Sequence, residues 1–116
     1  MFCTVKLNGN LAVGTVVQYS NTSSAWVIAT NHEDTIGVIT EHPTQDEAQS
    51  WWGKVTFAGT AYALADRDIP NSGGKLNVNL GGVFVDNASS ANGIIAPLTR
   101  GESSRAKGSL VLVDIR

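Results

Sequence analysis

Cysteine is almost missing from this chain, because Cys3 is the only one among its 116 residues. A single cysteine excludes an intrachain disulfide, and with it the small secreted folds that disulfides hold together. We expect Cys3 to be a small buried apolar residue. No basic segment followed by an apolar core and a cleavage site opens the sequence, so we expect synthesis in a reducing cytoplasm.

Charged residues are also scarce, at 16% of the chain, and 8 Lys and Arg against 10 Asp and Glu give a formal net charge of -2. Binding to nucleic acid needs clustered cations, and none are clustered here, so we expect no nucleic-acid partner. No apolar run approaches the roughly 20 residues that span a bilayer, so we expect no membrane partner. Hydrophobic residues still make up 42%, which is enough for a packed core. The low charge indicates that a partner covers part of the surface.

Helical periodicity is nearly absent, and the sequence has instead a series of short β-rich runs closed by Gly, Asn, Asp or Ser. The clearest run is 75–80, where Leu76, Val78 and Leu80 alternate with polar residues. This alternation predicts a half-buried strand with all three apolar side chains on the inner face. Gly81-Gly82 then predicts a bulge, a sharp bend or close backbone contact.

Other β-rich runs predict how the strands connect. Residues 13–19 and 25–30 flank a polar turn and predict a hairpin, and Asn8-Gly9-Asn10 predicts the start of an earlier one. Residues 109–115 are apolar on both alternating faces, which predicts a strand that is central or covered by a neighbouring subunit. Its place at the end of the sequence predicts that it closes a barrel.

Two segments differ from this pattern. Residues 44–47 (TQDE) have the capping-box form, which predicts one or two helical turns in a surface loop. Residues 97–108 form a long polar loop, and such loops in small domains are often functional. The whole chain is therefore predicted to be all-β, a small single-domain β-barrel or sandwich over residues 1–116 with at most one short surface helix.

Patterns that resemble catalytic sites fail on their own chemistry. Residues 101–105 (GESSR) lack the second glycine of a nucleophile elbow. The histidines in 32–34 (HED) and 41–42 (EH) lack helical ligand spacing and lie in polar loops. Residues 72–75 (SGGK) and 66–68 (DRD) are too short for a phosphate loop or a calcium loop. We therefore expect no enzyme activity, no metal and no cofactor.

The adjacent Trp51 and Trp52 are more informative, because neighbouring residues on a strand point to opposite faces. One of the two indoles is hard to bury, and three explanations stay open. In the first, the outward indole lies beside Lys54 and anchors an interface with a partner. In the second, the preceding loop of residues 41–50 covers the indole. In the third, it forms a sugar-binding platform with a second exposed aromatic residue such as Tyr19 or Tyr62.

Strand-and-glycine segments extend over nearly the whole chain from Gly14 onward. They are GTVV (14–17), WVIAT (26–30), IGVI (36–39), KVTFAGT (54–60), ALADRDIP (63–70) followed by GG (73–74), GGV (81–83), GIIA (93–96) and SLVLV (109–113). In this order they resemble the small β-barrel virion proteins of tailed bacteriophages. Those proteins include capsid decoration (cement) proteins and the β-domains of head and tail fibres.

The resemblance implies a viral structural protein that binds the assembled phage head and stabilises it. Its implied partners are the major capsid protein and other copies of itself, as a homotrimer. Its implied location is the capsid surface of the virion. A head-fibre, tail-fibre or host-adhesion β-domain, with or without carbohydrate binding, is the alternative. The candidate interface residues are Phe2, Trp51, Trp52, Arg100, Arg105 and Lys107.

Overall fold

The computed structural model describes residues 2–30, 36–87, 93–98 and 105–115. Within these ranges it has eleven strands and no helix, so the all-β prediction is confirmed. One sheet contains β1 (Phe2–Leu7), β2 (Val16–Ser20), β3 (Ala25–Ile28), β4 (Ile36–Ile39), β5 (Thr44–Gln45) and β6 (Trp51–Thr56). The other contains β7 (Gly59–Leu64), β8 (Gly74–Asn79), β9 (Gly82–Val85), β10 (Gly93–Ile95) and β11 (Leu110–Ile115).

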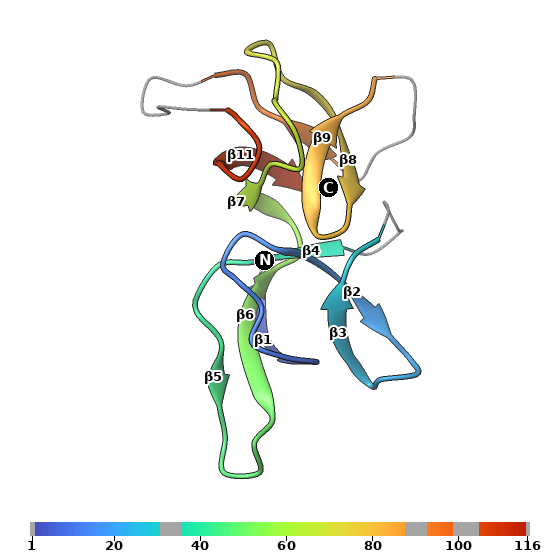
Figure 1. Ribbon diagram of the computed structural model, residues 1–116, viewed down its shortest axis with the longest axis vertical. Helices are drawn as coiled ribbons and strands as arrows, with labels where there is room; N and C mark the ends of the chain where they lie inside the picture. The colour runs from blue at the N-terminus through green and yellow to red at the C-terminus, as the bar shows by residue number, and fades with distance from the viewer. Residues whose placement is uncertain (1, 31–35, 88–92, 99–104, 116) are drawn as a thin grey trace.

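The two sheets are stacked along the longest axis of a molecule that measures 44 × 28 × 23 Å (Figure 1). The first sheet has the order β1-β3-β2-β4-β6-β5, and β1 also pairs with β6, so this sheet curls back on itself. The second has the order β7-β11-β10-β8-β9. A parallel bridge between Ala65 and Val83 brings the ends of the second sheet together, so it forms a five-stranded barrel.

The predicted hairpin of residues 13–19 and 25–30 is present as the antiparallel pair β2–β3. The hairpin predicted at Asn8-Gly9-Asn10 is wrong, because β1 pairs antiparallel with the distant β6. This pairing places the inner residues of β1 opposite β6, with Leu7 opposite Trp51, so the strand buries its apolar face there. As predicted, β11 is central, between β7 and β10, although the Ala65–Val83 bridge makes the closing contact.

Two apolar clusters form the core. The larger one combines β2 and β4 residues such as Val16 and Val38 with barrel residues such as Val83 and Val113. The smaller one lies within the first sheet, where Trp26, Trp51 and Phe57 pack against Leu7, Val17, Ile39 and Val55. Because the larger cluster draws on both sheets, the sheets share one core.

Cys3 is exposed, so its predicted burial is wrong. Cys3 lies opposite Val55, so it is on the same face of the sheet as the inner residues Val5 and Leu7. Among the described residues, however, β1 meets β3 only at the pair Leu7–Trp26, so Cys3 has a strand neighbour on the β6 side alone. The side chain therefore lies beyond the covered part of the core.

The helical turn predicted at 44–47 is also wrong, because Thr44–Gln45 is β5 and the next residues form the β5–β6 turn. Asp46 explains the difference. Its Oδ1 accepts the Ser50 N–H at 2.9 Å, and its own N–H donates to the Ser50 carbonyl at 3.0 Å. The polar side chain that would cap a helix closes a hairpin instead.

The strand predicted at 75–80 exists as β8, but its last apolar residue is misplaced. Leu80 is 70% exposed and has a φ of 48°, because Asn79 pairs with Gly82 and leaves Leu80 in the turn. The bend and close backbone contact predicted at Gly81-Gly82 are confirmed. A Cβ on Gly81 would lie 3.1 Å from side-chain atoms of both Ile28 and Thr15.

Candidate functional site

The outer face of β1 and β6 gathers exposed aromatic and cationic side chains. The antiparallel register places Phe2 opposite Thr56, Thr4 opposite Lys54 and Lys6 opposite Trp52. Residues directly opposite each other share a sheet face, and the intervening residues Val5, Leu7 and Val55 belong to the core on the other side. We call Phe2, Lys6, Trp52 and Lys54 the aromatic–lysine face.

Lys54 is held in place on this face by contacts on two sides. Its ammonium lies 3.9 Å from the centroid of the Phe2 ring, which is within cation–π range. The same Nζ lies 3.2 Å from Oε1 of Glu41. Phe2 is 61% exposed, so one side of its ring is left open to a partner. A largely exposed aromatic ring with a fixed cation beside it can bind apolar and acidic groups together.

Trp52 is oriented by the β5–β6 turn. Its indole Nε1–H donates to Oδ2 of Asp46 at 2.8 Å, and the indole is still 37% exposed. The Ser50 N–H, then the Trp52 indole, lower the pKa of Asp46 below its ordinary 3.8, and the positive charge of Lys6 adds to the effect. The Asp46 side chain is therefore an anion at neutral pH and fixes both the turn and the indole.

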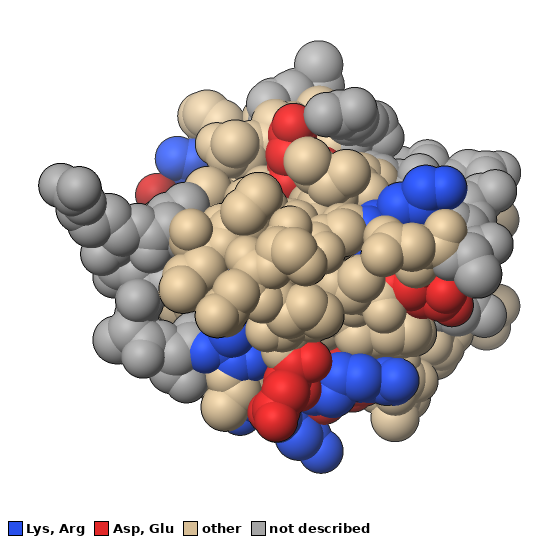
Figure 2. Space-filling model, turned by 90° about the horizontal axis from the view of Figure 1, so that it is seen from above, with Lys and Arg blue, Asp and Glu red and all other residues tan. Residues whose placement is uncertain are grey.

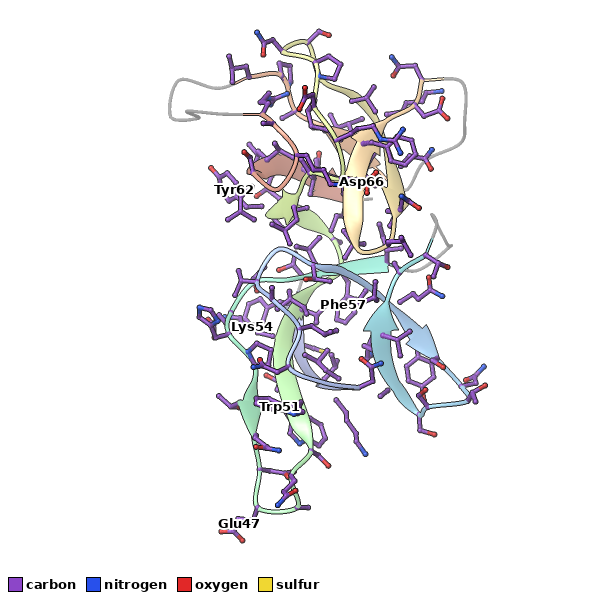
Figure 3. All side chains as sticks on the ribbon, viewed as in Figure 1. Glu47, Trp51, Lys54, Phe57, Tyr62 and Asp66 are labelled. Carbon is purple, nitrogen blue, oxygen red and sulfur yellow. The ribbon has the colours of Figure 1, made fainter. Side chains whose placement is uncertain are left out.

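The hairpin formed by β5 and β6 projects away from the barrel. Figure 3 places Glu47 at its free end, and Trp51 and Lys54 follow along β6 towards the barrel. The turn is tied further by Gln45, whose Nε2 donates to the Gln49 carbonyl at 3.1 Å. The hairpin is thus a projecting element whose end is fixed by its own hydrogen bonds.

The structure separates the two tryptophans. Trp51 is half-buried and packs against the smaller core cluster. Trp52 points outward, and the turn that precedes it contacts the indole through Asp46, so the preceding loop covers this side chain only in part. Neither tyrosine named for the sugar platform shares a face with Trp52, because Tyr19 packs edge-on against Trp26 of the smaller core cluster and Tyr62 lies on β7 in the second sheet. The exposed aromatic residue on the Trp52 face is Phe2.

Two of the three predicted cationic anchors, Arg105 and Lys107, lie away from Phe2 and Trp52. Arg105 is only 7% exposed, and its guanidinium donates to the carbonyl oxygens of Pro70 at 2.8 Å and Ala96 at 2.6 Å. It therefore ties barrel loops together. Lys107 is exposed, at the rim of a groove between the sheets. Arg100 lies outside the described residues, as do His32 and Asp34.

Sequence reasoning missed Lys6 and Asp46. Lys6 reaches the site through the pairing of β1 with β6, and no local pattern predicts a partner more than forty residues away in the sequence. For Asp46 a signal existed, because Asp is common in hairpin turns as well as at helix starts. The capping-box pattern favoured the helix over the turn.

Figure 2, which looks onto the barrel end, shows mainly uncharged atoms, with Lys, Arg, Asp and Glu grouped near the margin. No group of three or more His, Cys, Asp or Glu side chains in the described part of the chain lies together as a metal site would. The same ranges contain no helix that could span a membrane.

The aromatic–lysine face combines two exposed aromatic rings, two lysines and, beside Trp52, the fixed carboxylate of Asp46. This combination makes the face suited to binding.

Comparisons with known proteins find no family model, no curated protein and no solved structure that matches this chain. The likeness to phage virion proteins therefore rests on the strand-and-glycine segments of the sequence alone.

Proposed function

We propose that this chain is a capsid decoration protein of a tailed bacteriophage, which binds the assembled head through its aromatic–lysine face. The observation that carries the proposal is the outward Trp52, held in one orientation by the hydrogen bond to Asp46. Large aromatic side chains with a fixed orientation concentrate binding energy at protein interfaces, because little entropy is lost when they bind.

The face also fits a protein surface in its chemistry. Lys54 and Lys6 lie beside Phe2 and Trp52, so a surface with apolar pockets and carboxylates at their edges complements it. The whole chain carries a formal net charge of -2, so attraction at long range contributes little. Recognition then depends on the close contacts of these four side chains.

A decoration protein needs no chemical step. It binds the intact shell and not the dissociated subunits, so each bound copy stabilises the shell by mass action. The gain is about 2.7 kcal/mol per site when free protein exceeds its dissociation constant about a hundredfold. Many sites on one head add these gains together, so modest affinity per copy is enough.

The proposal is tested by adding purified protein to expanded heads that lack it, and measuring occupancy and the temperature at which DNA escapes. We expect the wild-type protein to raise that temperature. Trp52→Ala should weaken binding at least roughly tenfold, because it removes the oriented anchor. Leu98→Ala is the matched control, since it removes an exposed apolar side chain from the loop after β10 and should bind normally.

Three outcomes contradict the proposal. Binding without a rise in the DNA-release temperature would remove the decoration function and leave a fibre or adhesion function. If the protein labels host cells and does not bind heads, host adhesion takes its place. Equal occupancy for Trp52→Ala and Leu98→Ala would move the head-binding surface away from the aromatic–lysine face.

A further inference from the structure

A second surface lies at the junction of the two sheets, where the β8–β9 turn meets the first sheet. It holds a groove of about 260 Å³, whose lining includes Ile28, Leu64, Asp66, Leu80, Gly82 and Lys107. None of these residues belongs to the aromatic–lysine face. The groove lies beside the most exposed large apolar side chain in the described residues, Leu80.

Leu80 is unfavourable in this position for two separate reasons. Its φ of 48° lies in the left-handed region, which strains every residue with a Cβ and is normally taken by Gly or Asn. Its side chain is 70% exposed, so an apolar group faces water. With Gly81 at φ 82°, the turn has positive φ at both central positions, a geometry that favours Asn-Gly over Leu-Gly.

The backbone of the turn is fixed by contacts with the first sheet. The Gly81 N–H donates to the Ala29 carbonyl at 2.7 Å, and the Gly81 carbonyl accepts from the Val16 N–H at 2.8 Å. These bonds explain why the turn keeps its strained conformation. They do not involve the Leu80 side chain, so the fold accounts for the turn and leaves the leucine unexplained.

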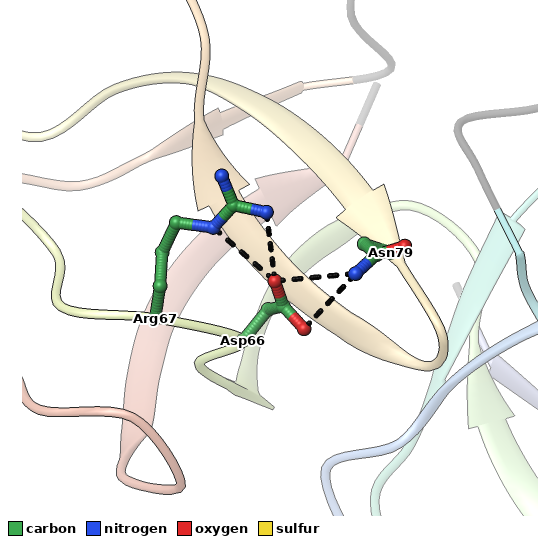
Figure 4. A network of polar contacts seen from close by, with 3 residues as sticks. All are labelled: Asp66, Arg67 and Asn79. Atoms are coloured by element: carbon green, nitrogen blue, oxygen red, sulfur yellow. Dashed lines mark hydrogen bonds and ion pairs between the residues drawn. The ribbon is translucent and has the colours of Figure 1, made fainter.

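The same surface carries both charge signs. Asp66 is fixed by the Arg67 guanidinium at 3.0 Å and by the Asn79 side-chain amide at 3.3 and 3.4 Å (Figure 4). Lys107 lines the groove with it, and no described residue forms an ion pair with the Lys107 ammonium. Arg67 binds Oδ2 of Asp66, whereas among the described residues Oδ1 accepts from the Asn79 amide at 3.3 Å, so Oδ1 can accept from a further cation. A protruding leucine, an adjoining groove, this carboxylate oxygen and the Lys107 ammonium make the surface complementary to itself.

We propose that this surface binds a second copy of the chain around a two-fold axis. In a two-fold contact every interaction occurs twice. Leu80 of each copy enters the groove of the other, and Lys107 of each copy faces Asp66 of the other. The inference goes beyond the proposed function, since the pairing requires no capsid. A two-fold contact gives a dimer, whereas the resemblance to phage proteins implies a trimer.

Sedimentation of the purified protein without heads tests the pairing. We expect the wild-type chain to be dimeric at tens of micromolar. Leu80→Asn should weaken the dimer at least roughly tenfold, because it removes the apolar group that enters the groove. Lys107→Glu should also weaken it, because Glu would face Asp66 of the other copy. Leu98→Asn makes the same chemical change at another exposed leucine and should stay dimeric.

A thermal melt separates binding from folding. At concentrations where the wild-type chain is monomeric, Leu80→Asn should raise Tm by roughly 4 °C, because asparagine tolerates the left-handed region. A more stable variant that fails to pair is an outcome that a structural role for Leu80 would not produce. A wild-type monomer, an assembly that Leu80→Asn leaves intact, or a lowered Tm would each overturn the proposal. None of these outcomes depends on whether the protein binds heads.

Discussion

The two hairpin turns β5–β6 and β8–β9 share a strained backbone conformation but are held by different contacts. Each contains a residue other than glycine at positive φ, Gln49 at 65° and Leu80 at 48°. The β5–β6 turn projects into solvent and is held by hydrogen bonds of its own side chains, chiefly from Asp46. The β8–β9 turn is held by main-chain bonds of Gly81 to the first sheet.

The two turns therefore depend on different parts of the molecule for their stability. A turn fixed by its own side chains keeps its shape at the free end of a projecting hairpin, so it can present Trp52 without support from the barrel. A turn fixed by a neighbouring sheet depends on the packing between the sheets, and in return it connects them. Substitutions at Gly81 should therefore lower the stability of the whole fold, whereas substitutions at Asp46 should disturb only the projecting β5–β6 hairpin.

The largest effect is expected for Gly81→Ala. A Cβ at this position lies 3.1 Å from side-chain atoms of Ile28 and Thr15, and the φ of 82° strains any residue that has one. Strain and crowding together should lower the free energy of unfolding by about 2–3 kcal/mol, measured by urea denaturation.

Gly59→Ala is the control for this substitution. Gly59 has a φ of 92°, but nothing lies within 4 Å of the Cβ position, so only the strain remains. We expect a loss of about 1 kcal/mol. Equal losses for the two variants would show that the contact of Gly81 with the first sheet adds nothing to stability.

The sequence predicted the parts of the fold that depend on neighbouring residues. The all-β class, the β2–β3 hairpin and the strand β8 follow from alternation and turn residues that lie close together in the chain. The same is true of the bend at Gly81-Gly82. Local alternation could not show where β8 ends, because Leu80 continues the pattern and is removed from the strand only by the Asn79–Gly82 pairing.

The site was less accessible from the sequence than the fold. Phe2 was an interface candidate and is exposed, whereas the sequence left open which of Trp51 and Trp52 points outward. The common face of Phe2 and Trp52 depends on the pairing of β1 with β6. The exposed position of Cys3 depends on the same long-range pairing. Arg105 was placed at an interface because it lies in a polar loop, yet it is buried, since its guanidinium satisfies two main-chain carbonyls.

The β5–β6 turn should respond to Asp46→Asn with a smaller and more local change. The amide can still accept the Ser50 N–H, but its other end is a donor and cannot accept from the Trp52 indole. We expect Tm to fall by roughly 3 °C. Trp52 should become more accessible to a fluorescence quencher, while the barrel signals in an NMR spectrum stay in place.

The same turn should be sensitive to acid. Folding lowers the pKa of Asp46 below 3.8, so its carboxylate stabilises the turn above that pH, and the stabilisation is lost as pH falls through the lower folded-state value. The Trp52 indole N–H resonance should therefore shift with a midpoint below pH 3.8. The shift should be absent in Asp46→Asn, and a midpoint above 3.8 would contradict the hydrogen bonding described for Asp46.

The smallest effect is expected for Gln49→Gly, which tests whether positive φ has the same cost in both turns. Glycine removes the strain at φ 65°, and it keeps the main-chain carbonyl that accepts from the Gln45 side chain. It also increases the entropy of the unfolded chain, which offsets part of the gain. We expect a net rise of roughly 0.5 kcal/mol in the free energy of unfolding, measured by urea denaturation. Leu80→Gly should give a similar rise in the monomer, because relief of strain is a property of the backbone. If Gln49→Gly destabilises the protein and Leu80→Gly does not, the Gln49 side chain itself stabilises the projecting turn. Contacts of that side chain would then offset the backbone strain at Gln49, and no such contacts would offset the strain at Leu80.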